Sequence, residues 1–335
     1  MVKIGVIGIG VWGYNHVRVL SEVEESNLVA VSDLNNNRAK EISTRFRIPN
    51  YYSDHNKMLE KEDLDAVIIA VPSKFHKNVF LDCIKHNIAI FIEKPIADTL
   101  ESADEMIIAL ENKNVVFTVG HIERFNPVIM KIRELIESNY AGEIYLVDTI
   151  RSGPFPKRLY DVGILADLAV HDVDIINYLI GRIKQLYSNI IFSNGREIYA
   201  KVLFKVSETV KGSSEFSWVS PKRIREIKIH GTKGTIVGDY TNQSVWFYEN
   251  ADFIEGTFTD YQSMVVGGSI SEGKVIRFPI SKSEPLKNEI KHFIYCVKNK
   301  KKPFITAEES REALKIATLI FKSGEEDKII EVETQ

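Results

Sequence analysis

Three polar side chains in the stretch DVGILADLAVHDVDIIN, residues 161–177, have a spacing that could do chemistry. Asp167, His171 and Asp174 stand at positions i, i+4 and i+7, so in an α-helix they project from one face. Three such groups could ligate a metal ion, relay a proton, or form the polar stripe of an amphipathic helix. The kind of site therefore depends on the groups that the rest of the chain brings to them.

A glycine motif near the N-terminus indicates a dinucleotide site. Gly8, Gly10 and Gly13 in GVIGIGVWG have the G-x-G-x-x-G spacing, directly after a predicted strand and at the start of a predicted helix. Gly8 allows the tight turn, Gly10 lets a pyrophosphate approach the backbone, and Gly13 lets helix and strand pack closely. The free N–H groups at the start of the helix then bind phosphate. The alternative is a glycine-rich turn in a nucleotide-free α/β domain.

An acidic residue at the end of the second predicted strand favours NAD over NADP. Asp33 stands 20 residues beyond Gly13, where such folds hold the carboxylate that binds the ribose hydroxyls. A carboxylate repels a 2′-phosphate, and Arg38 is too far along the chain for a clear phosphate clamp. We expect the cofactor to contact Gly8, Gly10, Val11, Trp12, Gly13, Asp33, Arg38, Val71, Pro72, Ser73, His76, Glu93 and Lys94.

Two further predicted strands end in polar residues at the sheet edge that faces the cofactor crevice. The strand LDAVIIAVP is followed by Ser73 and His76, which could contact the cofactor; His76 could equally cap or pack the next helix. The strand in IAIFIEKPIA ends abruptly at Glu93 and Lys94. A lysine there could hydrogen-bond a substrate oxygen, and the alternative is a surface lysine beside a turn.

The elements that would position these groups form two domains. In residues 1–120 short apolar segments alternate with helical ones, which predicts an NAD-binding Rossmann domain, an α/β doubly wound parallel sheet. Residues 121–335 contain two helical stretches and then a run of strands joined by short Gly, Ser and Asn turns. They predict an α+β domain with a large, mostly antiparallel sheet for substrate binding and oligomerisation. A helix at about 306–323 could pack back on the first domain.

Composition excludes several classes of protein. The net charge of −3 gives no global electrostatic reason to expect binding to nucleic acid or to an anionic membrane. No stretch approaches the roughly 18 apolar residues of a membrane span, and the N-terminal apolar run breaks into glycines too early for a signal peptide. Cys83 and Cys296 look like core residues of a reduced protein. We expect a cytoplasmic protein with no nucleic-acid or membrane partner.

The order and spacing of these motifs resemble the Gfo/Idh/MocA oxidoreductases, the family of glucose–fructose oxidoreductase and inositol dehydrogenase. The resemblance covers the whole chain and implies nicotinamide-dependent oxidation or reduction of a sugar or polyol carbon. It matches Lys94 to the family's EKP lysine, and Asp167 and His171 to its second-domain acid and histidine. Many members have glycine two residues after the acid, where this chain has Ala169, and we expect the helix to be unchanged.

Two longer stretches, residues 119–129 and 151–175, are similar to the UDP-N-acetylglucosamine 3-dehydrogenase branch of this family. That resemblance implies oxidation of the sugar C3 hydroxyl to a ketone. Basic residues in the two stretches could bind a diphosphate. Arg124 could instead pair with Glu123 or with a helix end. The alternative for Lys157 and Arg158 is that they are solvated loop residues. The candidates for substrate binding are Lys94, Arg124, Asn126, Arg151, Lys157, Arg158, Asp167 and His171.

The predicted mechanism is a proton relay beside NAD⁺, which accepts the hydride. His171 would act as base, Lys94 would stabilise the negative charge on the same oxygen, and Asp167 would bind a neighbouring hydroxyl; Lys94 as base is the alternative. Asp174 then has a packing or capping role, and we expect no metal. We also expect a homodimer or homotetramer formed through the C-terminal sheet. The alternative functions are dehydrogenation of another sugar or inositol, a non-catalytic NAD-binding regulator, and a metal-dependent hydrolase.

Overall fold

The chain divides into two compact units. The computed structural model describes residues 1–111, 113–155, 163–250 and 273–333. The first unit comprises Met1–Phe125, Leu165–Ile175 and Ser283–Leu319, and the second comprises Asn126–Ile164, Ile176–Lys282 and Ile320–Gln335. The short segment that carries Asp167, His171 and Asp174 therefore belongs to the first unit, together with the glycine motif.

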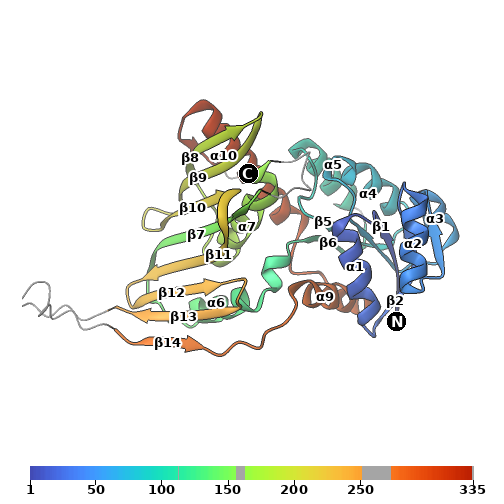
Figure 1. Ribbon diagram of the computed structural model, residues 1–335, viewed down its shortest axis with the longest axis horizontal. Helices are drawn as coiled ribbons and strands as arrows, with labels where there is room; N and C mark the ends of the chain where they lie inside the picture. The colour runs from blue at the N-terminus through green and yellow to red at the C-terminus, as the bar shows by residue number, and fades with distance from the viewer. Residues whose placement is uncertain (112, 156–162, 251–272, 334–335) are drawn as a thin grey trace, which may run out of the picture. The chain divides into compact units, whose positions relative to one another are not determined.

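A six-stranded parallel sheet lies at the centre of the first unit (Figure 1). Its strands follow the order β3-β2-β1-β4-β5-β6, and all neighbours are parallel. This order reverses beside β1, which is the doubly wound arrangement, and it confirms the predicted Rossmann fold. The strands are β1 (Val2–Ile7), β2 (Ser26–Ser32), β3 (Asn50–Tyr52), β4 (Ala66–Ile69), β5 (Ala89–Glu93) and β6 (Phe117–Gly120).

Helices cover both faces of this sheet. One apolar cluster joins the strands to α1, α2 and α9, and a second joins them to α3, α4, α5 and the first part of α10. Side chains alternate between the faces, so Ile68 enters one cluster and Ile69 the other. The helices are α1 (Val11–Glu22), α2 (Asn36–Phe46), α3 (His55–Lys61), α4 (His76–Ile84), α5 (Leu100–Glu111), α9 (Pro285–Asn299) and α10 (Ala307–Glu326), with the short η1 (Ser73–Phe75) and η2 (Ile122–Phe125).

The second unit contains a nine-stranded sheet in the order β14-β13-β12-β11-β7-β10-β9-β8-β15. The β7 and β10 strands are parallel and the other neighbouring pairs are antiparallel, which confirms the predicted mostly antiparallel sheet. The strands are β7 (Ile144–Pro154), β8 (Gln185–Ser193), β9 (Arg196–Lys205), β10 (Lys211–Ser217), β11 (Val219–Gly231), β12 (Gly234–Asp239), β13 (Ser244–Glu249), β14 (Val275–Phe278) and β15 (Ile330–Glu331).

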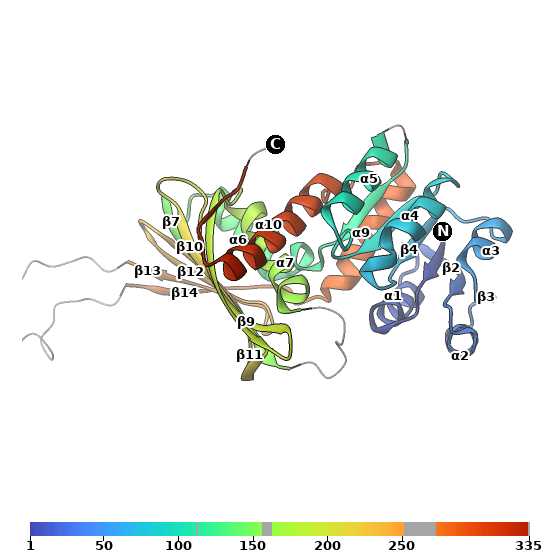
Figure 2. The same cartoon turned by 90° about the horizontal axis from the view of Figure 1, so that it is seen from above.

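One face of this second sheet is covered by helices. Helix α6 (Pro127–Glu137) packs on it so closely that a Cβ on Gly238 of β12 would lie 2.6 Å from Ile132 and 2.7 Å from Val128. Figure 2 shows α6 and the C-terminal part of α10 on the same side of the sheet. Because the strands alternate, the opposite face carries a different set of side chains. By register these include the exposed apolar residues Ile191, Leu203, Tyr248 and Val275.

No helix within the described ranges has both the length and the apolar character needed to cross a membrane.

Candidate functional site

The three glycines of the N-terminal motif each meet a different steric demand. Gly8 has a φ of +87°, a left-handed conformation that favours glycine. A Cβ on Gly13 would lie 1.8 Å from the Gly8 carbonyl oxygen, so only glycine lets α1 approach the turn after β1. Gly10 has no described atom within 4 Å of the position of a Cβ, and no side chain caps the start of α1 there. The loop thus leaves space and free N–H groups for an anion.

A cavity of about 420 Å³ adjoins this loop at the carboxyl ends of β1, β2 and β4. Five predicted cofactor residues line it: Gly8, Gly10, Asp33, Val71 and Pro72. Its size and its apolar walls fit part of a dinucleotide. The open glycine loop together with an acid beside it fits the pyrophosphate and ribose of NAD, so these residues could hold that cofactor.

Asp33 keeps acceptor capacity for hydroxyl groups. Its Oδ2 accepts a hydrogen bond from the Ile9 N–H at 2.7 Å, and its Oδ1 accepts one from the Asn35 N–H at 2.8 Å. A carboxylate has about four acceptor positions, so two remain for a ligand. Arg38 lies exposed in the first turn of α2, where its N–H donates to the Asn35 side chain. Val11 and Trp12 are exposed in the first turn of α1.

His76 joins the end of β4 to the EKP segment. It is buried, and its Nε2 and Nδ1 lie 2.9 Å from the carbonyl oxygens of Val71 and Pro95. Burial lowers the pKa of His76 and prevails over the carbonyl groups, which raise it. Ser73 begins η1, between Pro72 and this histidine. The ring therefore holds the end of β4 against the EKP segment, and its contact with the cofactor stays a prediction.

The EKP segment begins with a buried acid. Glu93 Oε1 lies 2.6 Å from Nε2 of His16, a fully buried histidine of α1 that sequence reasoning did not single out. Glu93 Oε2 accepts a hydrogen bond from the Lys94 N–H at 3.2 Å. The Lys94–Pro95 peptide bond is cis. Glu93 thus connects the first helix to the loop that holds Lys94.

Lys94 and Asp167 are in direct contact. The Lys94 ammonium donates to the Asp167 carbonyl oxygen at 2.9 Å, and its Nζ lies 3.4 Å from Oδ1 of the same residue. The Lys94 side chain is 8% exposed, which means that most of its aliphatic stem is buried while the ammonium stays paired. His171 follows four residues later and is also buried. The structure thus brings the lysine from the end of β5 to the segment predicted to carry the acid and the histidine.

The helical segment that carries these residues is not one continuous α-helix. Leu165–Ala169 form a π-helical turn, and α7 begins at Val170 and ends at Leu179. Asp167 is at the middle of this turn and His171 is in the first turn of α7. A π-turn widens the backbone ladder by one residue. The carbonyl of Asp167 meanwhile accepts the Lys94 ammonium, a tertiary contact that the sequence pattern does not contain.

Arg124, a predicted substrate ligand, lies in a buried ion pair. Its Nε and Nη2 donate to the Asp174 carboxylate at 2.9 and 2.6 Å, and its Nη1 donates to Glu309 at 3.1 Å. Arg124 and Asp174 are each 2% exposed. The contact ties α7 to η2 and to the first turn of α10, which agrees with a packing role for Asp174. Glu309 and Thr306 form the capping box of α10, a signal readable in TAEE.

Two other buried titratable groups lie near this ion pair. His121 Nδ1 is 3.6 Å from Asp174 Oδ2, and burial lowers the pKa of this histidine. Glu289 of α9 is buried, and neither carboxyl oxygen has a hydrogen-bond partner among the described residues. Burial, together with the nearby acids Glu93 and Asp174, raises the pKa of Glu289 well above its ordinary value. We did not predict either residue, because nothing in the local pattern marks them as buried.

The other predicted substrate residues belong to the second unit or lie outside the described residues. Asn126 caps α6 by accepting from the Val128 N–H at 3.1 Å. Arg151 on β7 is buried with its guanidinium over the Tyr240 ring, 5.4 Å from the centroid. Lys157 and Arg158 lie outside the described residues. Within the described part of the chain, no three His, Cys, Asp or Glu side chains form a group that could hold a metal ion.

Comparisons with known proteins agree with this geometry. Residues 2–121 match an oxidoreductase family with an NAD-binding Rossmann fold, and residues 129–237 match the C-terminal domain of the same Gfo/Idh/MocA family. The myo-inositol 2-dehydrogenase of Thermotoga maritima is 24% identical over 99% of this chain and 98% of its own length.

A second relative has a different substrate in its name. The UDP-N-acetylglucosamine 3-dehydrogenase of Acidithiobacillus ferrooxidans is 31% identical over 53% of this chain and 54% of that enzyme. A solved structure of a UDP-N-acetylglucosamine 3-dehydrogenase from this organism has a TM-score of 0.82 at 21% identity, covering 97% of this chain and 98% of its own, and shows the same fold. The two family matches together extend over most of the chain, which therefore belongs to the Gfo/Idh/MocA family of NAD-binding oxidoreductases.

Proposed function

We propose that this protein is an NAD-dependent dehydrogenase that oxidises the C3 hydroxyl of UDP-N-acetylglucosamine to the 3-keto sugar nucleotide. The observation that carries the proposal is the contact between Lys94 and Asp167 at the carboxyl end of β5, with His171 in the next helical turn. Ligands in doubly wound folds bind at this edge of the sheet. An ammonium, a carboxylate and an imidazole suit the handling of a hydroxyl proton there.

The proposed mechanism assigns one role to each of the three groups. Bound NAD⁺ supplies the hydride acceptor for the carbon that bears the hydroxyl. His171 removes the hydroxyl proton and passes it to solvent, since an imidazole titrates near neutral pH. Lys94 donates a hydrogen bond to the same oxygen and stabilises the negative charge that develops on it. Asp167 holds the Lys94 ammonium and binds a neighbouring sugar hydroxyl. Lys94 as the base remains the alternative assignment.

Sequence similarity supports the sugar-nucleotide substrate. Residues 119–129 and 151–175 resemble the UDP-N-acetylglucosamine 3-dehydrogenase branch, and the relative with that name is 31% identical over half of the chain. An inositol is the second candidate, because the relative named for it aligns with nearly the whole chain. We assign cofactor binding to residues 1–120, and substrate binding to residues 121–335 together with Lys94. Arg124 is already bonded to two carboxylates, so we do not assign it to the diphosphate.

We also propose that the face of the nine-stranded sheet opposite α6 joins two copies of the chain. Ile191, Leu203, Tyr248 and Val275 are between 44% and 55% exposed on this face. They lie on β8, β9, β13 and β14, and exposed apolar side chains on a sheet face can mark a subunit interface. A homodimer or homotetramer would bury them.

Absorbance of the reduced cofactor tests the proposed substrate. The enzyme is incubated with NAD⁺ or NADP⁺ and with UDP-N-acetylglucosamine, N-acetylglucosamine or myo-inositol. We expect reduction with NAD⁺ and UDP-N-acetylglucosamine, and a much lower kcat/KM with the free sugar. Reduction with myo-inositol and none with the nucleotide sugar would replace the first candidate by the second. No reduction with any sugar or polyol would favour a non-catalytic NAD-binding protein.

A further inference from the structure

A second cavity lies at the opposite edge of the parallel sheet from the glycine loop. It has a volume of about 680 Å³ and is lined at the amino ends of the strands by Val2 of β1, Ala89 of β5 and Phe117 of β6. The segment between α9 and α10, residues 300–306, forms another wall. Because parallel strands all point the same way, this edge is the one that does not face the predicted cofactor site. All of its lining residues belong to the first unit.

Lysine side chains dominate the polar lining of this cavity. The lining contains five lysines but only two carboxylates, those of Asp65 and Glu308. The cavity is therefore positively charged although the whole chain has a net charge of −3. A hollow lined mainly by one sign of charge concentrates the electrostatic potential and attracts ions of opposite charge. The five are Lys113, Lys298, Lys300, Lys301 and Lys302.

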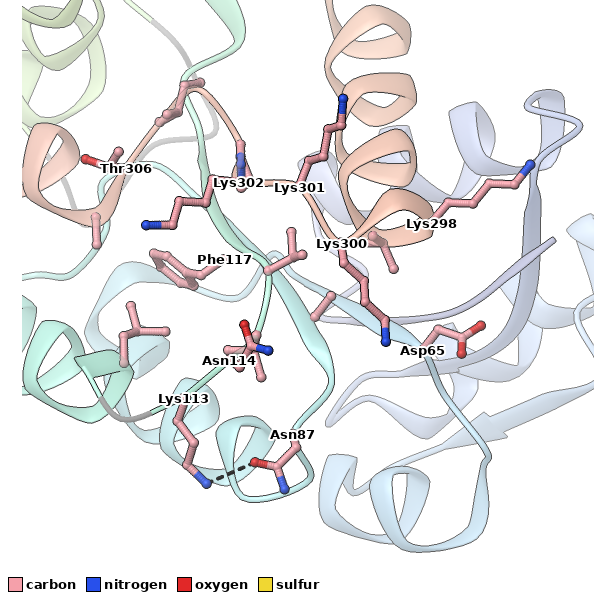
Figure 3. Close-up of a pocket in the computed structure, with 18 of the residues that line it drawn as sticks. Asp65, Asn87, Lys113, Asn114, Phe117, Lys298, Lys300, Lys301, Lys302 and Thr306 are labelled. Carbon is pink, nitrogen blue, oxygen red and sulfur yellow. Dashed lines mark hydrogen bonds between the residues drawn. The ribbon is translucent and has the colours of Figure 1, made fainter.

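Most of these ammonium groups lack an anionic partner among the described residues. Lys113 donates to the Asn87 side chain at 3.0 Å, and Lys301 lies over the Tyr295 ring. The side chains of Lys298, Lys300 and Lys302 have neither an ion pair nor a hydrogen bond within the described residues. In Figure 3, Lys300 extends toward Asp65 and Lys302 lies beside Phe117, whereas Lys298 and Lys301 point away from these residues. Lys300 and Lys302 are therefore the two that face the hollow.

The remaining lining suits an organic anion. The amides of Asn87 and Asn114 and the hydroxyl of Thr306 provide uncharged polar groups (Figure 3), and Phe117 and Ile305 provide an apolar wall. The volume lies in the range of about 300–1,000 Å³ typical of small-molecule sites. We propose that this cavity binds a small organic molecule that carries two or more phosphate groups. Lysine binds phosphate as a mobile point charge, and the carbon skeleton would contact the apolar wall.

Calorimetric titration tests this site. The full-length protein is first saturated with NAD, so that the glycine loop cannot bind the added phosphate. It is then titrated at fixed ionic strength with inorganic triphosphate and, separately, with fructose 1,6-bisphosphate. We compare the wild type with the cavity variant Lys300→Gln/Lys302→Gln. The matched control is Lys57→Gln/Lys291→Gln, which removes the same charge from exposed positions outside the cavity.

The expected result is one triphosphate per chain, displaced by the bisphosphate. The cavity variant should bind triphosphate with a Kd about fivefold higher or more, because it loses two partly exposed ion pairs with the ligand. The Kd of the control variant should stay within about twofold of the wild-type value. Equal thermal unfolding midpoints will show that both variants are folded. Absence of triphosphate binding at millimolar concentration, or the same loss in both variants, would overturn the proposal. Displacement of triphosphate by hexaglutamate but not by the bisphosphate would also overturn it, since the site would then fit an acidic peptide.

Discussion

Removing the carboxylate that neutralises Arg124 should strongly destabilise the protein. In the variant Asp174→Asn the guanidinium remains buried and keeps its contact with the more exposed carboxylate of Glu309. Breaking a buried ion pair by neutralising one partner costs about 3–5 kcal/mol, because the other charge stays buried. We expect about 3 kcal/mol, at the lower end, because Glu309 still offsets part of the charge.

Urea denaturation measures this loss as a fall in the free energy of unfolding. The control is Glu134→Gln, which breaks the exposed Lys131–Glu134 pair of 2.7 Å and should cost at most about 1 kcal/mol. Replacing both buried partners, as Arg124→Met/Asp174→Leu, should recover most of the loss, because neither buried charge remains and the carboxylate of Glu309 is partly exposed to water. If Asp174→Asn were no more destabilising than Glu134→Gln, the buried pair would not hold α7 as described.

Three further predictions concern the cofactor loop, the buried acid and the candidate catalytic groups. Gly10→Ala adds a methyl group that meets no described atom within 4 Å, so the thermal unfolding midpoint should be unchanged. The methyl group would occupy the space expected for the pyrophosphate, so calorimetry should show an affinity for NAD that is about tenfold weaker. An unaltered affinity would contradict a phosphate site at this loop. Burial raises the pKa of Glu289 in the folded protein. The contribution of this carboxyl group to the free energy of unfolding is therefore complete below its pKa in the unfolded chain, near 4.5, and is lost as the pH rises toward its pKa in the folded protein. Urea unfolding between about pH 5 and pH 8 should therefore show that the free energy of unfolding of Glu289→Gln increases relative to that of the wild type as the pH rises. A relative decrease would show that the carboxyl group is ionised in the folded protein. Finally, His171→Asn should lower kcat by about 10²–10⁴-fold with NAD binding retained, and Lys94→Met should do the same; near-native kcat in His171→Asn would exclude the histidine as base.

The parallel-sheet region was predictable because its signals are local. The glycine motif, the acid at the end of β2 and the polar ends of β4 and β5 each follow an apolar strand in the sequence. Carboxyl ends of parallel strands meet at one edge, so strand order alone brings Asp33 and Pro72 to the same cavity. The contact between Lys94 and Asp167 could be expected only from the family resemblance, because the two residues are 73 positions apart.

The features that were missed depend on tertiary contacts. Nothing in DLAVH predicts a π-turn, whose central carbonyl accepts the ammonium of Lys94. Arg124 looks like a free cation in the sequence, and only the fold brings Asp174 to its guanidinium. Glu289 is an ordinary helical glutamate by pattern, and its burial results from the packing of α9. In each case the contact or the burial depends on residues from a distant part of the chain.

Transfer of deuterium from the substrate to the cofactor is a direct test of oxidation at C3. UDP-N-acetylglucosamine that carries deuterium at C3 is incubated with the enzyme and NAD⁺, and both products are analysed by mass spectrometry. We expect one deuterium in the reduced cofactor, and we expect the sugar nucleotide to become a ketone without the label. Reduced cofactor that contains no deuterium, or a sugar nucleotide that keeps it, would contradict oxidation at C3.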